Sequence, residues 1–256
     1  MPARRGLPKT NDAELPEGEV LAPAKVSVLK AIEIKPPVVG RVEVTVRGIT
    51  ELICHNWSKK AIIEIEKKHA GETRLKKSPQ IPDEDYRASM YNLEDGRYGF
   101  PASGVKACLV DAVRMVSDLT MTTAQRVLYV EGIPTQLVRR RQDLVVLEGE
   151  PYMREDFPRN ATGVVDIRYR AAFPEWKMRF TIQYVGTILT LEQVINLVNY
   201  AGMMGLGEWR PSAPKGKSGT NGMFELFDVG EAMEEVRQWD PKQHKQITVP
   251  FTAPSR

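Results

Sequence analysis

The sequence predicts an α+β protein with a ferredoxin-like, or RRM-like, antiparallel sheet that two helices cover on one face. Three observations support this fold class. Several segments alternate apolar and polar residues, as half-buried strands do. Two longer segments carry apolar stripes at helical spacing. When one accessory hairpin is set aside, the elements follow the β-α-β-β-α-β order of that fold.

The predicted strands are short and strongly patterned. In residues 41–47 three valines point to one side, and charged or polar residues point to the other. Residues 164–170 and 176–185 repeat the pattern, and the short link between them predicts a hairpin. Three further strands are expected at residues 126–130, 143–147 and 223–229.

Two predicted helices supply the covering layer. Residues 103–118 carry one apolar stripe at helical spacing. Residues 190–204 begin with a capping box formed by Thr190 and Gln193, and Gly205 is well placed to end this helix. Shorter helices are expected at residues 58–68 and 231–239.

The chain is expected to form one domain between two flexible ends. Residues 1–24 are rich in proline, glycine and charge, which indicates a flexible N-terminal arm. Residues 241–256 indicate a flexible C-terminal tail in the same way. The domain spans residues 25–240 and carries insertions near residues 57–95 and 132–161.

Composition narrows the class of protein. The 256 residues include two cysteines without paired spacing, so a disulfide framework or a cysteine zinc site is not expected. No apolar stretch is long enough for a membrane helix, and the N-terminus lacks a secretory pattern. A soluble protein of the cytoplasm is expected, in the host cytoplasm if a phage encodes it. The net charge of +3 does not by itself indicate a polyanion partner.

A basic sheet face is the first candidate site. Alternation places the polar members of neighbouring strands on a common side of the sheet. Ferredoxin-like proteins that bind RNA use such a surface. The alternative is a solvated outer face, with these cations paired to nearby carboxylates. The basic residues concerned are Arg47, Arg168, Arg170, Lys177 and Arg179.

The glycine-rich segment at residues 202–222 is the second candidate. Glycines let the backbone come close to a phosphate, basic residues supply positive charge and a tryptophan supplies a stacking surface. Pro211 stands where a nucleoside-triphosphate-binding loop requires its first glycine, so that motif is excluded. The alternative is a flexible connector. The residues that carry the candidate are Gly205, Gly207, Trp209, Arg210, Lys215 and Lys217.

Two further candidates lie in loops. Arg139, Arg140 and Arg141 precede aromatic residues, and this combination suits single-stranded nucleic acid, although a solvated loop explains it equally well. His55 follows the first strand and could act as a general base. The alternative for His55 is a hydrogen bond that fixes its loop. No residue spacing matches a metal site, so neither a metal nor another cofactor is expected.

Three segments carry a family resemblance. Residues 42–56 (VEVTVRGITELICHN), residues 96–113 (GRYGFPASGVKACLVDAV) and the closing GLGEWRP…GMFEL resemble phage and prophage proteins of unknown role. More broadly, residues 37–229 resemble the RAMP superfamily, which includes the backbone subunits of CRISPR effector complexes. That superfamily has a glycine-rich loop between its last helix and last strand. In this chain Gly202, Gly205 and Gly207 match the start of the loop, Gly219 and Gly222 match its end, and PSAPKGK interrupts it.

The resemblance implies binding along single-stranded RNA or DNA, often as a head-to-tail filament of identical subunits. We therefore expect a non-catalytic protein that binds single-stranded nucleic acid without sequence specificity and assembles as a homo-oligomer. Some members of the superfamily cleave RNA with a histidine after the first strand, where His55 falls. One alternative is therefore a metal-independent endoribonuclease. The other is a phage or CRISPR-type assembly protein that does not bind nucleic acid.

Overall fold

The computed structural model describes residues 34–71, 79–116, 118–138, 140–159, 163–214 and 218–251. The chain divides into two units, Met1–Lys35 and Pro36–Arg256, and the fold described below belongs to the second. Residues 1–24, predicted as a flexible arm, lie outside the described residues. No helix among the described residues is long and apolar enough to cross a membrane.

A large antiparallel sheet forms the centre of this unit. Its strands follow the order β12-β11-β1-β10-β7-β4-β3. Outside this order, β5 pairs with β10 and β6 pairs with β7. A smaller sheet has the order β2-β9-β8. The large sheet contains β1 Val38–Gly48, β3 Tyr91–Asn92, β4 Tyr98–Pro101, β5 Leu128–Val130, β6 Ile133–Leu137, β7 Arg140–Glu148, β10 Lys177–Val185, β11 Phe224–Asp240 and β12 Lys245–Pro250. The small sheet contains β2 Leu52–Ile53, β8 Tyr152–Asp156 and β9 Arg168–Phe173.

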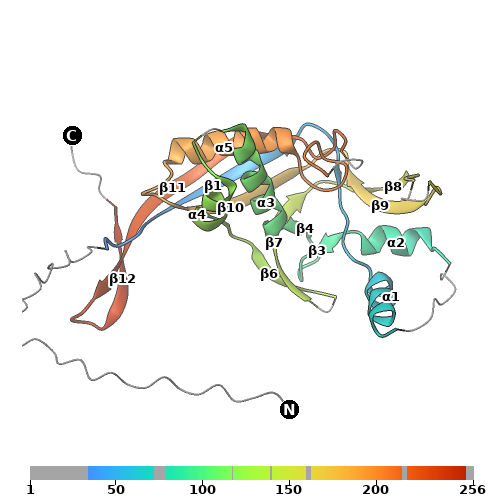
Figure 1. Ribbon diagram of the computed structural model, residues 1–256, viewed down its shortest axis with the longest axis horizontal. Coiled ribbons are helices and arrows are strands. Elements are labelled where there is room, and N and C mark those ends of the chain that lie inside the picture. Colours follow the sequence, from blue (N-terminus) through green and yellow to red (C-terminus); the bar gives the residue numbers. More distant parts are fainter. Residues whose placement is uncertain are drawn as a thin grey trace, which may run out of the picture. The chain divides into compact units, whose positions relative to one another are not determined.

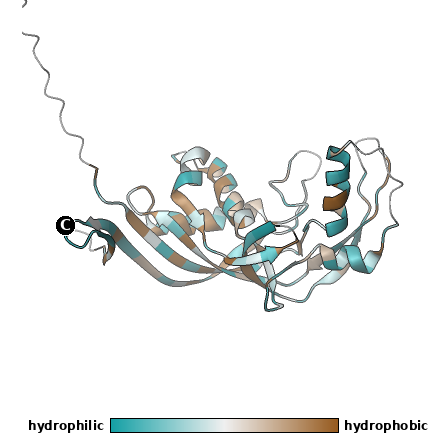
Figure 2. Cartoon of the chain, turned by 90° about the horizontal axis from the view of Figure 1, so that it is seen from below, coloured by the Kyte–Doolittle hydropathy of each residue, from teal (hydrophilic) through white to brown (hydrophobic). Residues whose placement is uncertain are grey.

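Helices cover one face of the large sheet. Figures 1 and 2 show α3 and α5 on the same side of the long strands. Their buried side chains, such as Val105 and Val198, join one core with Val44 and Ile182 of the sheet. The structure is a mixed α/β fold with a large antiparallel sheet, which is compatible with the predicted α+β class. The helices of the described residues are α1 Lys59–His69, α2 Pro82–Ala88, α3 Ala102–Ala112, α4 Met121–Val127 and α5 Leu191–Met204.

The predicted alternation of the first strand is confirmed. In β1, Val42, Val44 and Val46 are fully buried, whereas the residues between them are exposed or partly exposed. Val44 lies opposite Phe180 in β10, which is buried as well. Each such side chain contributes about 1.5–3 kcal/mol when it is fully buried, so this strand pair anchors the core. The predicted capping box of Thr190 and Gln193 is also present at the start of α5.

The predicted hairpin between residues 164–170 and 176–185 is wrong. The strand β9 begins only at Arg168 and pairs with β2 and β8, whereas β10 pairs with β1, β5 and β7. Alternation specifies which face of a strand is buried but not which strand lies beside it. Four consecutive buried residues, from Arg170 to Phe173, show that β9 is covered on both faces, unlike β10.

The C-terminal part of the unit also differs from expectation. The closing helix predicted for residues 231–239 is wrong, because β11 continues through this segment to Asp240. In the stretch predicted as a tail, residues 245–250 form β12, which pairs with β11 from Glu235 to Asp240. The apolar spacing of this segment fits a helix, but pairing with β1 and with β12 satisfies its backbone groups as a strand.

Candidate functional site

Two loops and the start of a strand, all distant in the sequence, meet at one place. Nδ1 of His55, in the loop after β2, lies 2.6 Å from Oε1 of Glu208, in the loop after α5. The amide of Glu208 donates to the carbonyl of Ile53 at 3.1 Å. From β7, Nη2 of Arg140 donates to Oδ1 of Asn56 at 3.1 Å. The structure thus brings together the candidate histidine, the glycine-rich loop and part of the arginine run.

The glycines hold the loop after α5 against the chain itself. Gly207 has a φ of +72°, and a Cβ at this position would overlap the carbonyl oxygen of Ile53. Gly222 has a φ of +70°, and a Cβ there would overlap the carbonyl oxygen of Leu206. Only glycine tolerates both the backbone conformation and the close approach. These contacts explain the two glycines without any ligand.

A groove of about 660 Å³ lies between α3 and this loop. His55 lines it together with basic side chains from both walls: Lys106 and Arg114 from the helix side, and Arg210 from the loop. Arg114 pairs with Asp111, with 2.9 Å between Nε and Oδ1. Arg210 is held in place, because its Nη1 donates to the carbonyl of Gly207 at 2.9 Å. Asp111 and Glu208 line the groove as well, so its three basic side chains face two carboxylates and leave a small excess of positive charge.

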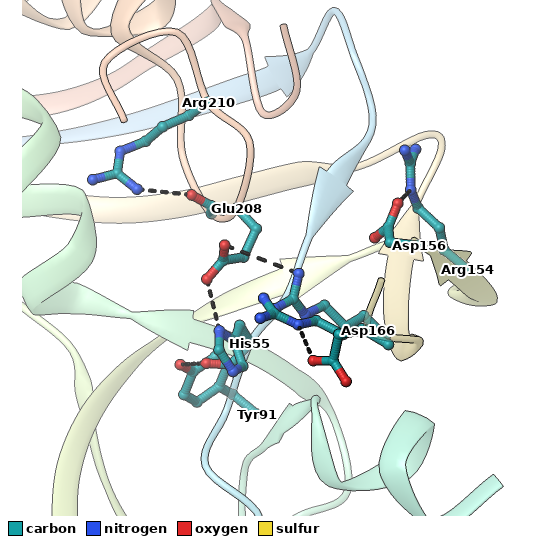
Figure 3. A network of polar contacts seen from close by, with 10 residues as sticks. His55, Tyr91, Arg154, Asp156, Asp166, Glu208 and Arg210 are labelled. Carbon is teal, nitrogen blue, oxygen red and sulfur yellow. Dashed lines mark hydrogen bonds and ion pairs between the residues drawn. The ribbon is translucent and has the colours of Figure 1, made fainter. Parts of the chain in front are cut away.

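Glu208 is the electrostatic centre of the site (Figure 3). The hydrogen bond from His55 lowers the pKa of Glu208 to about 2; burial opposes this effect, and the nearby charges of Arg170 and Arg168 reinforce it. The Arg170 side chain is only 4% exposed, and its Nη1 lies 4.0 Å from Oε2 of Glu208. Nη1 of Arg170 has no hydrogen-bond partner among the described residues. Glu208 is thus the main carboxylate that compensates this buried cation, and Asp156 and Asp166 contribute as well.

Two neighbours of His55 stay protonated. Tyr91 donates its hydroxyl to the backbone carbonyl of His55 at 2.8 Å. Burial raises the pKa of Tyr91, and also that of the Cys54 thiol, to about 12. Neither group ionises near neutral pH, so we do not expect either to act as a nucleophile.

The residues of the predicted basic sheet face lie on two different sheets. Lys177 lies directly opposite Arg47, and Arg179 lies opposite Thr45, so these three cations share the face that α3 and α5 leave uncovered. The placement of Arg168 and Arg170 on this face is wrong, because β9 belongs to the small sheet. Arg170 is in addition buried.

Carboxylates and an aromatic ring accompany the cations that remain on this face. Arg47 pairs with Glu225 of β11. Nζ of Lys177 lies 4.4 Å from the ring centroid of Phe227, in a cation–π contact. Arg41, farther along β1, pairs with Glu131. These local contacts therefore compensate much of the positive charge on this face. A role of Arg47, Lys177 and Arg179 in binding nucleic acid stays a prediction.

The other residues predicted to bind nucleic acid differ in their exposure to solvent. Trp209 is partly buried with a φ of +55°, and its indole nitrogen is buried without a partner among the described residues. Arg141 is exposed in β7. Arg139, Lys215 and Lys217 lie outside the described residues.

Sequence reasoning missed Trp57. Its side chain is 47% exposed, and its ring stacks on the ring of His55, with 6.2 Å between the centroids and 22° between the planes. Its place between His55 and the start of α1 is the signal that could have identified it. Among the described residues, no group of three or more histidine, cysteine, aspartate or glutamate side chains could hold a metal ion.

The fold and the site define a mixed α/β protein with a large antiparallel sheet and a groove bordered by the loop after its last helix. No protein-family model matches the chain, and no curated protein matches it. A solved structure described as the Type III-B Cmr-beta bound to cognate target RNA contains a chain of similar structure, with 14% sequence identity and a TM-score of 0.41. The match covers 76% of this chain and 60% of the other, so this chain spans less than two thirds of that chain's length.

Proposed function

We propose that the protein binds single-stranded nucleic acid, without sequence specificity, in the groove between α3 and the loop after α5. The observation that carries this proposal is the convergence of three sequence-predicted candidates at one groove. His55 and Arg210 come from separate loops and line the groove, and Arg140, at the start of β7, lies beside it through its bond to Asn56. The three residues were selected from separate segments of the sequence. Their proximity in the fold therefore favours a common ligand over three unrelated solvated segments.

The chemistry of the groove suits a phosphate backbone. Lys106 and Arg210 line it, Arg140 lies beside it, and Lys59 is exposed at the start of α1 next to Trp57. Lysine and arginine bind phosphate oxygens through charge-assisted hydrogen bonds. Contacts of this kind follow the backbone and carry no base sequence, which supports binding without sequence specificity.

A fluorescence-anisotropy titration with a labelled single-stranded oligonucleotide tests the proposal. We expect clear binding at about 50 mM salt and an affinity about 20-fold lower at about 200 mM salt, on the assumption of roughly three neutralised phosphates. Lys106→Ala with Arg140→Ala should weaken binding strongly. Lys177→Ala is the matched control, because it removes a cation from the uncovered sheet face. No binding at low salt would reject the proposal, and a stronger effect of Lys177→Ala would move the site to the sheet face.

Head-to-tail assembly is the finer part of the proposal. In the strand order, β12 and β3 stand at opposite ends of the large sheet, and each pairs with a single strand among the described residues. Two different free edges allow a heterologous contact, which produces a linear array when it does not close. Light scattering on the same samples measures assembly. A mass that grows with oligonucleotide length supports it, whereas oligomers that ignore nucleic acid favour a pure assembly protein.

A metal-independent ribonuclease is the second candidate, and the contact between His55 and Glu208 favours it. A carboxylate at Nδ1 fixes the orientation of an imidazole and leaves Nε2 to exchange a proton with substrate. Under this candidate, the protein cleaves RNA in the presence of a chelator and leaves DNA of the same sequence intact. His55→Ala should abolish cleavage, and Glu208→Gln should reduce it. Intact RNA after prolonged incubation with the wild type rejects this candidate.

A further inference from the structure

We propose that Trp57 is a stacking platform for one unpaired base beside the groove. The inference rests on the proposed function and names the residue that distinguishes a single strand from a duplex. Trp57 is exposed, and it stacks on His55, which itself lines the groove. A base that leaves a strand held in the groove would therefore meet an aromatic surface next to its phosphates.

The platform is held in position before any ligand arrives. The amide of Trp57 donates to Oδ1 of Asn56 at 2.9 Å. Asn56 in turn donates from Nδ2 to the carbonyl of Met90 at 3.0 Å and accepts from Arg140 at 3.1 Å. Ser58 caps α1 directly after the tryptophan. A fixed backbone lowers the conformational entropy that binding costs.

The structure favours Trp57 over Trp209 for this role. The indole nitrogen of Trp209 is buried, and its ring is partly covered. Trp57 has nearly half of its side chain accessible. The stack on His55 also favours an aromatic ligand, because a base would extend a pair of rings that is already nearly parallel. Stacking tolerates every base and requires that the base be unpaired.

Oligonucleotides with abasic positions provide the test. We expect Trp57→Ala to weaken binding of a normal single strand about tenfold, and Trp57→Phe to restore most of the affinity. With an oligonucleotide that is abasic at every position, no shift of the strand can place a base on Trp57, so the difference between wild type and Trp57→Ala should disappear. Duplex binding should change little. Phe227→Ala is the matched control, because Phe227 is equally exposed but lies on the uncovered sheet face.

The outcomes separate this inference from the proposed function. If the wild type binds and Trp57→Ala binds equally well, the platform is rejected while the proposed function stands. If Trp57→Ala loses the same factor with normal and abasic strands, the effect is structural and the platform is again rejected. If the wild type does not bind any single strand, the proposed function fails, and the platform fails with it.

Discussion

Gly222→Ala is expected to lower the free energy of unfolding by about 2–5 kcal/mol, from a left-handed backbone cost of about 1–2 kcal/mol and an overpacking cost of about 1–3 kcal/mol. The φ of Gly222 is +70°, and the added methyl group would overlap the carbonyl oxygen of Leu206. The backbone cannot move away easily, because the amide of Gly222 donates to the carbonyl of Glu51 at 2.7 Å. Urea unfolding followed by circular dichroism measures the effect.

Gly96→Ala is the matched control for this substitution. Gly96 has a φ of +87°, but nothing lies within 4 Å of the position that its Cβ would occupy. Only the backbone cost of about 1–2 kcal/mol is therefore expected. Equal destabilisation by the two substitutions would show that the overlap at Gly222 relaxes without cost.

Glu208→Gln is expected to destabilise the protein by about 2–3 kcal/mol at neutral pH and by very little near pH 2. The substitution removes the charge that faces Arg170 and weakens the bond to His55. The pKa of Glu208 falls from 4.5 to about 2 in the fold, so its contribution to stability is fully present above pH 4.5. That contribution is lost as the pH falls toward 2.

The measurement is the free energy of unfolding of wild type and variant across this acid range. The two curves should converge as the pH falls from about 5 to about 2. Glu225→Gln is the control, because Glu225 pairs with Arg47 where both side chains are about half exposed. It should cost less than about 1 kcal/mol. Parallel curves for wild type and Glu208→Gln would contradict the assignment of the low pKa to Glu208.

The elements that the sequence predicted well are those determined by local pattern. The alternation in β1 and the capping box of α5 depend on residues a few positions apart. Strand partners depend on contacts that no local pattern contains, and for this reason the hairpin between β9 and β10 was predicted wrongly. Residues 231–239 have an apolar spacing that fits a helix, but they form a strand because they pair with β1 and β12.

The candidate site shows the same division. His55 and the glycine-rich loop were selected from their own segments, but their contact spans 153 residues of chain. The buried position of Arg170 follows from the small sheet, which the sequence did not predict. Trp57 was missed because its exposure and its stack on His55 exist only in the folded chain.

The closure of the loop after α5 has a consequence for how its length can vary. Leu206 donates to the carbonyl of Gly222 at 2.9 Å, and this bond joins the two ends of the intervening segment. Doubling the length of a closed loop costs only about 0.6 kcal/mol. Insertions at the tip of this segment, away from Gly207, Glu208 and Arg210, are therefore expected to cost little stability. The stretch PSAPKGK separates the glycines of this loop, where added chain length costs little folding free energy.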